Sequence, residues 1–119
     1  MVHSVDIRPA AAEHPRVRFY RGDCNAPETL FPAEVLAQAP RPWLVIEDAH
    51  QNVAGVLAFL HERLQAGDYL VVEDSDVKRI DLAAFDGTHP GQYKVDTRYT
   101  DFFGRNATCA NDSIFVRQN

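Results

Sequence analysis

Two short runs of apolar residues, WLVI at 43–46 and YLVV at 69–72, constrain the fold more than any other feature of the sequence. Neither run alternates with polar residues, and continuous apolar runs of this length are typical of parallel strands covered on both faces. Between them, apolar residues recur at helical spacing over residues 51–66, and Gly67 follows as a helix stop. The spaced residues are Val53, Val56, Leu57, Leu60 and Leu64. The sequence therefore predicts a strand–helix–strand unit.

Weaker signals predict further elements on either side of this unit. VHSVDI at 2–7 and RVRFYRGD at 16–23 indicate strands that end on acids, and residues 25–40 indicate a helical connection limited by Pro32. The tail predicts two strands, at 93–103 and 113–118, separated by a turn-rich segment. Together these elements predict an α/β fold with a mostly parallel sheet and a C-terminal antiparallel hairpin, as a single domain over residues 1–119.

Composition narrows the classes of partner. The chain has 119 residues, and its 17 acidic residues against 12 basic ones give a net charge of -5, which disfavours nucleic-acid binding. No apolar run approaches the roughly 18 residues of a membrane span, and the N-terminus shows no secretory signal. Cys24 and Cys109 suggest free buried thiols and no metal pair. We expect a cytoplasmic protein with a small-molecule partner, and neither nucleic acid nor membrane.

Acidic residues follow four successive predicted strands. They are Asp6, Asp23, Glu47, Asp48, Glu73 and Asp74. In parallel α/β sheets, ligands bind beyond the carboxyl ends of the strands, where these acids are expected to lie. The sequence therefore predicts that these acidic side chains lie at the edge of the sheet and not in the core.

The acids after the two apolar strands predict a metal site. Glu47 or Asp48 and the pair Glu73 and Asp74 should converge, and carboxylates that converge repel unless a cation joins them. Hard oxygen ligands of this kind suit Mg²⁺. The alternative is that these acids are solvated loop residues, or that Asp48 caps the helix that begins near Asn52.

Three further residues suggest catalytic or cofactor roles. His50 lies three residues after Glu47, and imidazole suits proton abstraction near neutral pH, so His50 is a candidate general base. Asp6 fits a carboxylate that accepts both hydroxyls of a nucleoside ribose. Asp23 could lie near an adenine amino group, with Gly22 allowing close approach of the backbone.

The sequences VIEDAH at 45–50 and AGDYLVVEDSD at 66–76, with the aromatic tail, resemble the cephalosporin hydroxylase family and its relatives, the macrolide-sugar O-methyltransferases of the macrocin and mycinamicin type. The resemblance covers nearly the whole chain. It implies a Rossmann-like fold that binds S-adenosylmethionine. It also implies a Mg²⁺ held by an acid after the fourth strand and a Glu–Asp pair after the fifth, with a histidine three residues past the first acid. Glu47, Glu73, Asp74 and His50 occupy those positions.

The resemblance implies a Mg²⁺-dependent O-methyltransferase that acts on a hydroxyl of a sugar or natural product. The metal would bind the hydroxyl and His50 would take its proton, while Asp6, Gly22, Asp23 and Glu47 would bind S-adenosylmethionine. The family's usual first ligand is Asp, so Asp48 could share or replace Glu47 as a ligand. Residues 74–93 would form much of the substrate wall.

One feature of the family has no counterpart in the sequence. The central first strand and its glycine-rich motif are absent, which predicts that another chain supplies them or that the chain is part of a longer protein. A homo-oligomer or a complex with a partner chain that carries the missing strand is therefore expected. We therefore expect weak cofactor binding by the chain alone. The alternative function is a non-catalytic binding or assembly subunit, or a fragment, of a cephalosporin hydroxylase-like protein of antibiotic biosynthesis.

Overall fold

The computed structural model describes residues 1–107 and 109–119, and it divides into two units, Met1–Ala39 and Pro40–Asn119. The first unit begins with strands β1 (Val2–Asp6) and β2 (Val17–Arg21), which pair in parallel with Asp6 opposite Arg21. A 3₁₀ helix, η1 (Pro27–Thr29), and helix α1 (Ala33–Gln38) follow. The two predicted strands and the helical connection are therefore confirmed.

Proline and glycine set the shape of the connection in this first unit. Pro27 opens η1, and Pro32 is the N-cap of α1, where the absence of an N–H costs no hydrogen bond. Gly22 directly follows β2, and the side chains of Val5 and Leu30 pack closely against it. A Cβ at this position would lie 2.9 Å from Val5 Cγ2 and 3.0 Å from Leu30 Cδ2. Any larger residue at position 22 would force Val5 and Leu30 apart.

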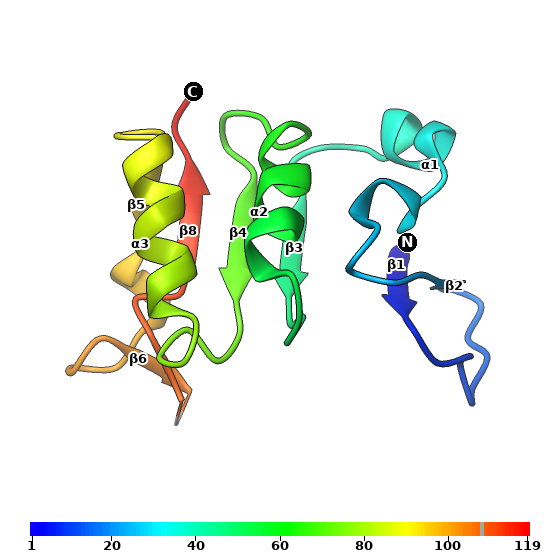
Figure 1. The fold of residues 1–119 in the computed structure, drawn as a ribbon, viewed down its shortest axis with the longest axis horizontal. Coiled ribbons are helices and arrows are strands. Elements are labelled where there is room, and N and C mark those ends of the chain that lie inside the picture. The colour runs from blue at the N-terminus through cyan, green and yellow to red at the C-terminus, as the bar shows by residue number, and fades with distance from the viewer. Residues whose placement is uncertain (108) are drawn as a thin grey trace. The chain divides into compact units, whose positions relative to one another are not determined.

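The second unit contains a four-stranded sheet in the order β3-β4-β8-β5 (Figure 1). Strands β3 (Leu44–Glu47) and β4 (Tyr69–Val72) are parallel, and β8 (Ile114–Arg117) runs antiparallel to both β4 and β5 (Tyr93–Val95). Helices α2 (Val53–His61) and α3 (Arg79–Thr88) pack on one face. The predicted α/β fold, its strand–helix–strand unit and its antiparallel C-terminal pairing are confirmed.

The core of this unit lies between α2 and the sheet. Its buried centre consists of Val53, Leu57, Leu64, Leu70 and Val72, and partly buried residues of α3, β5 and β8 pack against it. These centre residues come from the two apolar patterns of the sequence, the helical spacing and the YLVV run. The hydrophobic pattern therefore identified the core correctly.

The tail differs from its prediction in detail. The predicted strand at 93–103 is limited to β5, because the 3₁₀ helix η2 (Thr97–Tyr99) begins directly after Asp96, whose side chain caps it by accepting from the Arg98 N–H. The turn-rich segment holds a short antiparallel pair, β6 (Arg105–Ala107) and β7 (Ala110–Asn111). Helix α3 was not predicted, because none of its residues is buried and its apolar pattern is weak.

A buried carboxylate joins the segments that precede β3 and β4. Asp68 is 1% exposed, accepts hydrogen bonds from the backbone N–H groups of Trp43 at 2.7 Å and Gln65 at 2.8 Å, and forms an ion pair with Arg41. Because a buried charge is costly without partners, these bonds make Asp68 a structural residue. It stabilises the edge of the sheet where β3 and β4 begin, which is opposite to the edge formed by their carboxyl ends.

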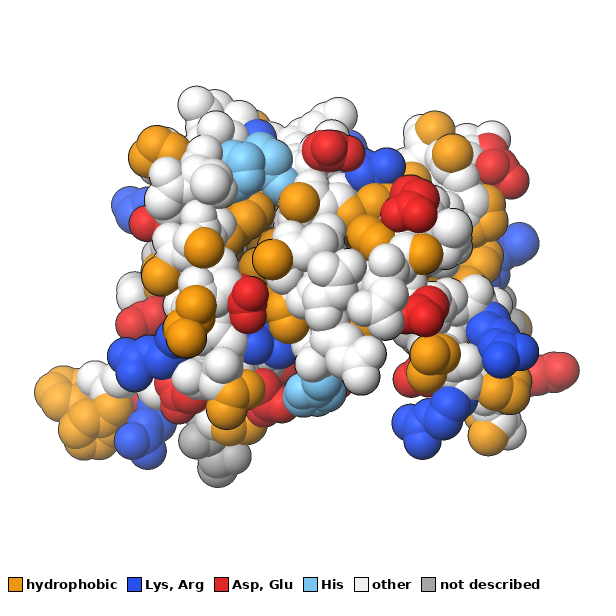
Figure 2. Space-filling model, in the orientation of Figure 1, with side chains coloured by type: hydrophobic (Ala, Val, Ile, Leu, Met, Phe, Trp, Pro, Cys, Tyr) orange, Lys and Arg blue, Asp and Glu red, His pale blue; other side chains and the backbone are white. Residues whose placement is uncertain are grey.

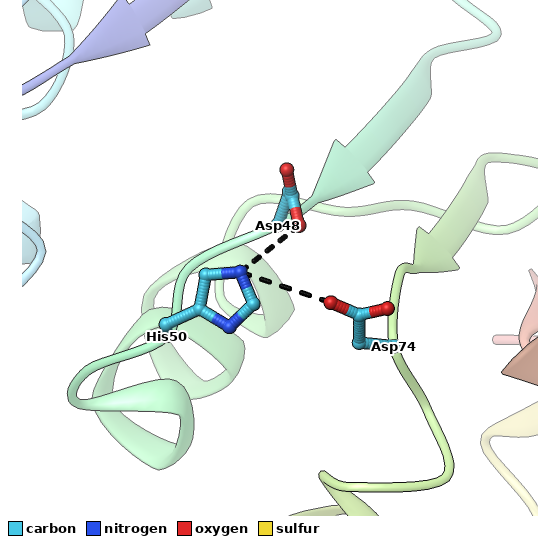
Figure 3. A group of neighbouring side chains, drawn as sticks. All are labelled: Asp48, His50 and Asp74. Atoms are coloured by element: carbon cyan, nitrogen blue, oxygen red, sulfur yellow. Dashed lines mark ion pairs between the residues drawn. The ribbon is translucent and has the colours of Figure 1, made fainter. Parts of the chain in front are cut away.

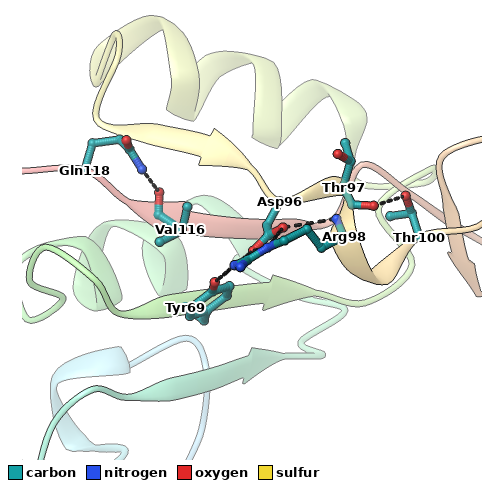
Figure 4. A network of polar contacts seen from close by, with 7 residues as sticks. All are labelled: Tyr69, Asp96, Thr97, Arg98, Thr100, Val116 and Gln118. Carbon is teal, nitrogen blue, oxygen red and sulfur yellow. Dashed lines mark hydrogen bonds and ion pairs between the residues drawn. The ribbon is translucent and has the colours of Figure 1, made fainter.

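A second polar network lies beside β4 and β5 (Figure 4). Asp96 accepts hydrogen bonds from the Tyr69 hydroxyl at 2.8 Å and from the Arg98 Nε at 2.9 Å, and Arg98 Nη2 also donates to the Tyr69 hydroxyl. The Arg98 guanidinium, followed by the Tyr69 hydroxyl, holds the pKa of Asp96 well below its ordinary value. The charged form of Asp96 is therefore the one that stabilises the fold.

We expect Asp96→Asn to destabilise the protein near neutral pH and progressively less as the pH falls below about 4. A carboxyl whose pKa is lowered by folding contributes stability above its unfolded pKa, and that contribution is lost as the pH falls toward the folded value. Urea unfolding of parent and variant between pH 7 and pH 3 measures the difference. The control is Asp86→Asn, since no described residue donates a hydrogen bond to that exposed carboxylate. A constant difference across this range would contradict the assignment.

Candidate functional site

Three ionisable side chains, Asp48, His50 and Asp74, meet at the carboxyl ends of β3 and β4 (Figure 3). His50 Nε2 lies 3.7 Å from Asp48 Oδ1 and 3.7 Å from Asp74 Oδ2. One potential ligand atom from each residue lies within 4.8 Å of the other two. Two carboxylates therefore face the same imidazole nitrogen.

The parallel pairing of β3 and β4 brings these residues together. Glu47, the last residue of β3, lies opposite Val72, and the Glu73 N–H donates to the Glu47 carbonyl at 2.9 Å, which extends the pairing by one residue. Asp74 then turns the chain with a φ of 52°, a left-handed conformation that Asp tolerates better than most residues. Figure 2 shows acidic side chains and a histidine gathered at this edge of the second unit.

The geometry is compatible with a divalent metal ion. Octahedral ligand atoms at about 2.1 Å from Mg²⁺ lie about 3.0 Å apart when adjacent and about 4.2 Å apart when opposite. The potential ligand atoms of Asp48 and Asp74 lie within 4.8 Å of each other, which is close to the second of these values. The Asp48, His50 and Asp74 side chains are 60%, 65% and 30% exposed, so solvent and ligands can reach them.

Two predicted ligands lie outside the cluster. The side chain of Glu47 is buried, with Oε2 2.9 Å from the Lys78 ammonium and Oε1 accepting from the Ala49 N–H at 2.7 Å. Glu73 is exposed and does not join the group formed by the described residues. Of the two acids considered after β3, the structure therefore brings Asp48, and not Glu47, to His50 and Asp74.

The alternative role of Asp48 as a helix cap is wrong. The N-cap of α2 is Asn52, which adopts a left-handed φ of 50° and makes no side-chain capping bond. Its amide instead occupies the space above Gly55, where an added Cβ would lie 2.5 Å from the Asn52 side chain. Asp48 is left exposed and adjacent to His50.

The predicted cofactor residues of the first unit lie at the carboxyl ends of its parallel strands. Asp6 ends β1, and its Oδ1 accepts the Arg8 backbone N–H at 2.7 Å, which holds the pKa of Asp6 below its ordinary value. Asp23 follows β2 by two residues and accepts from the Asn25 N–H at 2.9 Å. Gly22 separates β2 from Asp23, and its N–H donates to the Asp6 carbonyl at 3.1 Å.

A cavity of 860 Å³ lies in the second unit beside α3. Ser75 and Asp76, which directly follow Asp74, line it together with Phe85, Tyr93 and Phe115. Much of its lining comes from residues 74–93, the segment expected to form the substrate wall. A cavity of this size suits a small organic molecule.

Sequence reasoning missed two contacts of the site. The Cys109 thiol donates to Asp74 Oδ1 at 2.7 Å, and Lys78 pairs with Glu47. The contact of Cys109 spans 35 residues and has no local sequence signal. Lys78 had a weak signal, since it lies close to the acidic segment 73–76, but its partner was not predictable from that segment.

No protein-family model matches the sequence, and no curated protein matches it. Two solved structures share its fold. One is described as "CmcI-N160 apo-structure", with a TM-score of 0.69 and 20% identity over 98% of this chain and 51% of that chain. The other, "cmcI-N160 SAH", has a TM-score of 0.64 and 18% identity over 98% of this chain and 54% of that chain.

These matches define the class of fold, which is the α/β fold of the two CmcI structures. A protein that shares this fold is therefore CmcI, and the resemblance to the cephalosporin hydroxylase family is confirmed at the level of the fold. The chain spans about half the length of the CmcI chains that it matches. Among the described residues, no helix is both long and apolar enough to cross a membrane.

We expect Asp48→Ala and Asp74→Ala each to lower the affinity for Mn²⁺ at least ~10-fold, because each removes one carboxylate of the cluster. The matched control is Glu73→Ala, which removes the same charge from the residue next to Asp74 but outside the cluster. Calorimetric titration of the complete protein with Mn²⁺ and Mg²⁺ measures the three affinities. Equal losses in all three variants would indicate general attraction by negative charge and no site.

Proposed function

We propose that the chain forms the base- and metal-bearing part of an S-adenosylmethionine-dependent O-methyltransferase that acts on a hydroxyl of a sugar or natural product. The observation that carries the proposal is the convergence of Asp48 and Asp74 on His50 at the carboxyl ends of parallel strands. The fold supports it, since it is shared with the structure described as "cmcI-N160 SAH". SAH is the product that remains when S-adenosylmethionine loses its methyl group.

Asp48 and Asp74 are the proposed metal ligands. A Mg²⁺ ion, when bound, would lower the pKa of the acceptor hydroxyl. His50 takes the proton of that hydroxyl through Nε2, and the two carboxylates, each 3.7 Å from this nitrogen, stabilise the resulting imidazolium. His50 therefore acts as the general base, and S-adenosylmethionine supplies the methyl group.

Asp6, Gly22 and Asp23 are the proposed cofactor residues. Both acids lie at the carboxyl ends of parallel strands, where nucleoside ribose and adenine groups bind in folds of this kind. Glu47 has no cofactor or ligand role in the proposal, because Ala49 and Lys78 already occupy its two oxygens. The acceptor would occupy the cavity lined by Ser75, Asp76 and the aromatic residues of α3, β5 and β8.

The edge strand β3 supports a proposed association with another strand. In the described sheet β3 pairs only with β4, and the side chains of Leu44 and Ile46 are exposed, each by more than half, at 68% and 59%. A free sheet edge next to exposed apolar side chains favours pairing with a further strand. A second copy or a partner chain would supply it.

We expect the complete protein to bind SAH, and Asp6→Ala to weaken that binding at least ~10-fold, because a carboxylate that accepts both ribose hydroxyls contributes two charge-assisted hydrogen bonds. The matched control is Glu34→Ala, which removes an exposed acid of α1 in the same unit. Calorimetry with SAH measures both variants. Absence of SAH binding in the complete protein would overturn the proposed function, whereas unchanged binding in Asp6→Ala would remove only the role of Asp6.

We expect His50→Ala to lower the rate of methyl transfer by ~10² to 10⁴-fold with little change in SAH or Mn²⁺ affinity, because a general base acts on the proton and not on the binding of either group. The assay follows transfer from S-adenosylmethionine to an acceptor found by screening sugars and hydroxylated natural products. The control is His14→Ala, which removes an exposed histidine of the first unit. A collapse of Mn²⁺ affinity in His50→Ala would make His50 a metal ligand and not the base.

A further inference from the structure

Glu47 and Lys78 form a buried ion pair next to the exposed cluster. Lys78 is 3% exposed and Glu47 is 0% exposed at their side chains, and Lys78 Nζ donates to Glu47 Oε2 at 2.9 Å. The pair joins residues that are 31 positions apart, the last residue of β3 and the N-cap of α3. A charged pair is rarely buried unless the surrounding structure holds both partners.

Both oxygens of the Glu47 carboxylate accept a hydrogen bond, and the two donors belong to different loops. Oε1 accepts from the Ala49 N–H at 2.7 Å, and Ala49 lies between Asp48 and His50. Oε2 accepts from Lys78, at the end of the turn that starts at Asp74. One side chain therefore connects the loop that carries Asp48 and His50 to the loop that carries Asp74.

The backbone of Lys78 completes the connection to Asp74. The N–H groups of Val77 and Lys78 both donate to the Asp74 carbonyl, at 3.0 and 3.3 Å. The position of the Lys78 side chain is thus coupled through one turn to the position of Asp74. The exposed cluster itself has little packing to hold it, since His50 and Asp48 are 65% and 60% exposed.

We propose that the Glu47–Lys78 pair is a positioning device that sets the separation between Asp48 and His50 on one loop and Asp74 on the other. The proposal rests on the proposed function only for what the cluster binds, a divalent cation. Glu47 and Lys78 do not touch the cation. They hold the Asp48 and Asp74 carboxylates close enough for one ion to engage both, with His50 beside them, and without the pair the two loops separate and the carboxylates diverge.

The test replaces the whole pair, because removing one partner leaves a buried charge and could unfold the protein. Replacement of a buried pair by apolar residues of similar size is often neutral for stability, so Glu47→Leu with Lys78→Met should remain folded. We expect this double variant to bind Mn²⁺ at least ~10-fold more weakly than the parent, the size of effect typical of removing a group that orients metal ligands. Titration of the free Mn²⁺ signal by electron paramagnetic resonance measures the affinity.

Two further variants separate positioning from general stability. Asp68→Leu with Arg41→Met removes the ion pair of Asp68, which precedes β4, and should leave Mn²⁺ affinity within ~3-fold of the parent even if it lowers the thermal midpoint. Lys78→Arg keeps a cation beside Glu47 and should retain most of the affinity. Unchanged Mn²⁺ affinity in the double variant Glu47→Leu, Lys78→Met would overturn the proposal.

A second measurement distinguishes failure of the positioning device from failure of the metal site. Nuclear Overhauser contacts between the His50 ring and the Asp74 side chain report the separation of the two loops without any metal. We expect these contacts in the parent and in Lys78→Arg, and their loss in the double variant. If the parent does not bind Mn²⁺ but the contacts are lost as expected, the metal assignment fails and the positioning role stands. If the contacts persist in the double variant, the positioning role is wrong.

Discussion

The parallel pairing of β3 with β4 is the constraint on which the candidate site depends. Its register places Glu47 opposite Val72, so the two strands end side by side. The residues that follow them therefore lie at the same edge of the sheet. A slip of one residue would turn the core-facing side chains of the slipped strand away from α2. Packing of the hydrophobic core therefore fixes the register of β3 and β4. That register in turn places Asp48, His50 and Asp74 close to one another.

The acidic residues of the second unit fall into two groups that differ in burial and in ion pairing. Glu47, Asp68 and Asp96 are buried, and each is paired with a basic side chain, Lys78, Arg41 and Arg98 respectively. Asp48 and Asp74 are more exposed, and their described ion pairs are with His50. A buried carboxylate requires a partner to offset the loss of water, whereas an exposed one remains available to a ligand. This division separates structural acids from candidate ligands.

Much of the fold could be predicted because its signals are local. The runs at 43–46 and 69–72 and the spaced apolar residues between them became β3, β4 and α2. Helix α3 was missed, since it lies on the surface of its unit with no buried residue. The strand expected at 93–103 was too long, because the hydrogen bonds that end it at Asp96 come from Arg98 and, across the sheet, from Tyr69.

The sequence by itself determined that acids and a histidine follow the apolar strands, and that a parallel sheet would carry them to one edge. Only the tertiary structure decided which acids meet. Glu47 and Asp48 are adjacent in the sequence, yet the strand directs one into the interior, where Lys78 from a distant turn pairs with it, and leaves the other at the surface beside His50. Such a choice depends on a partner 31 residues away, which no local pattern encodes.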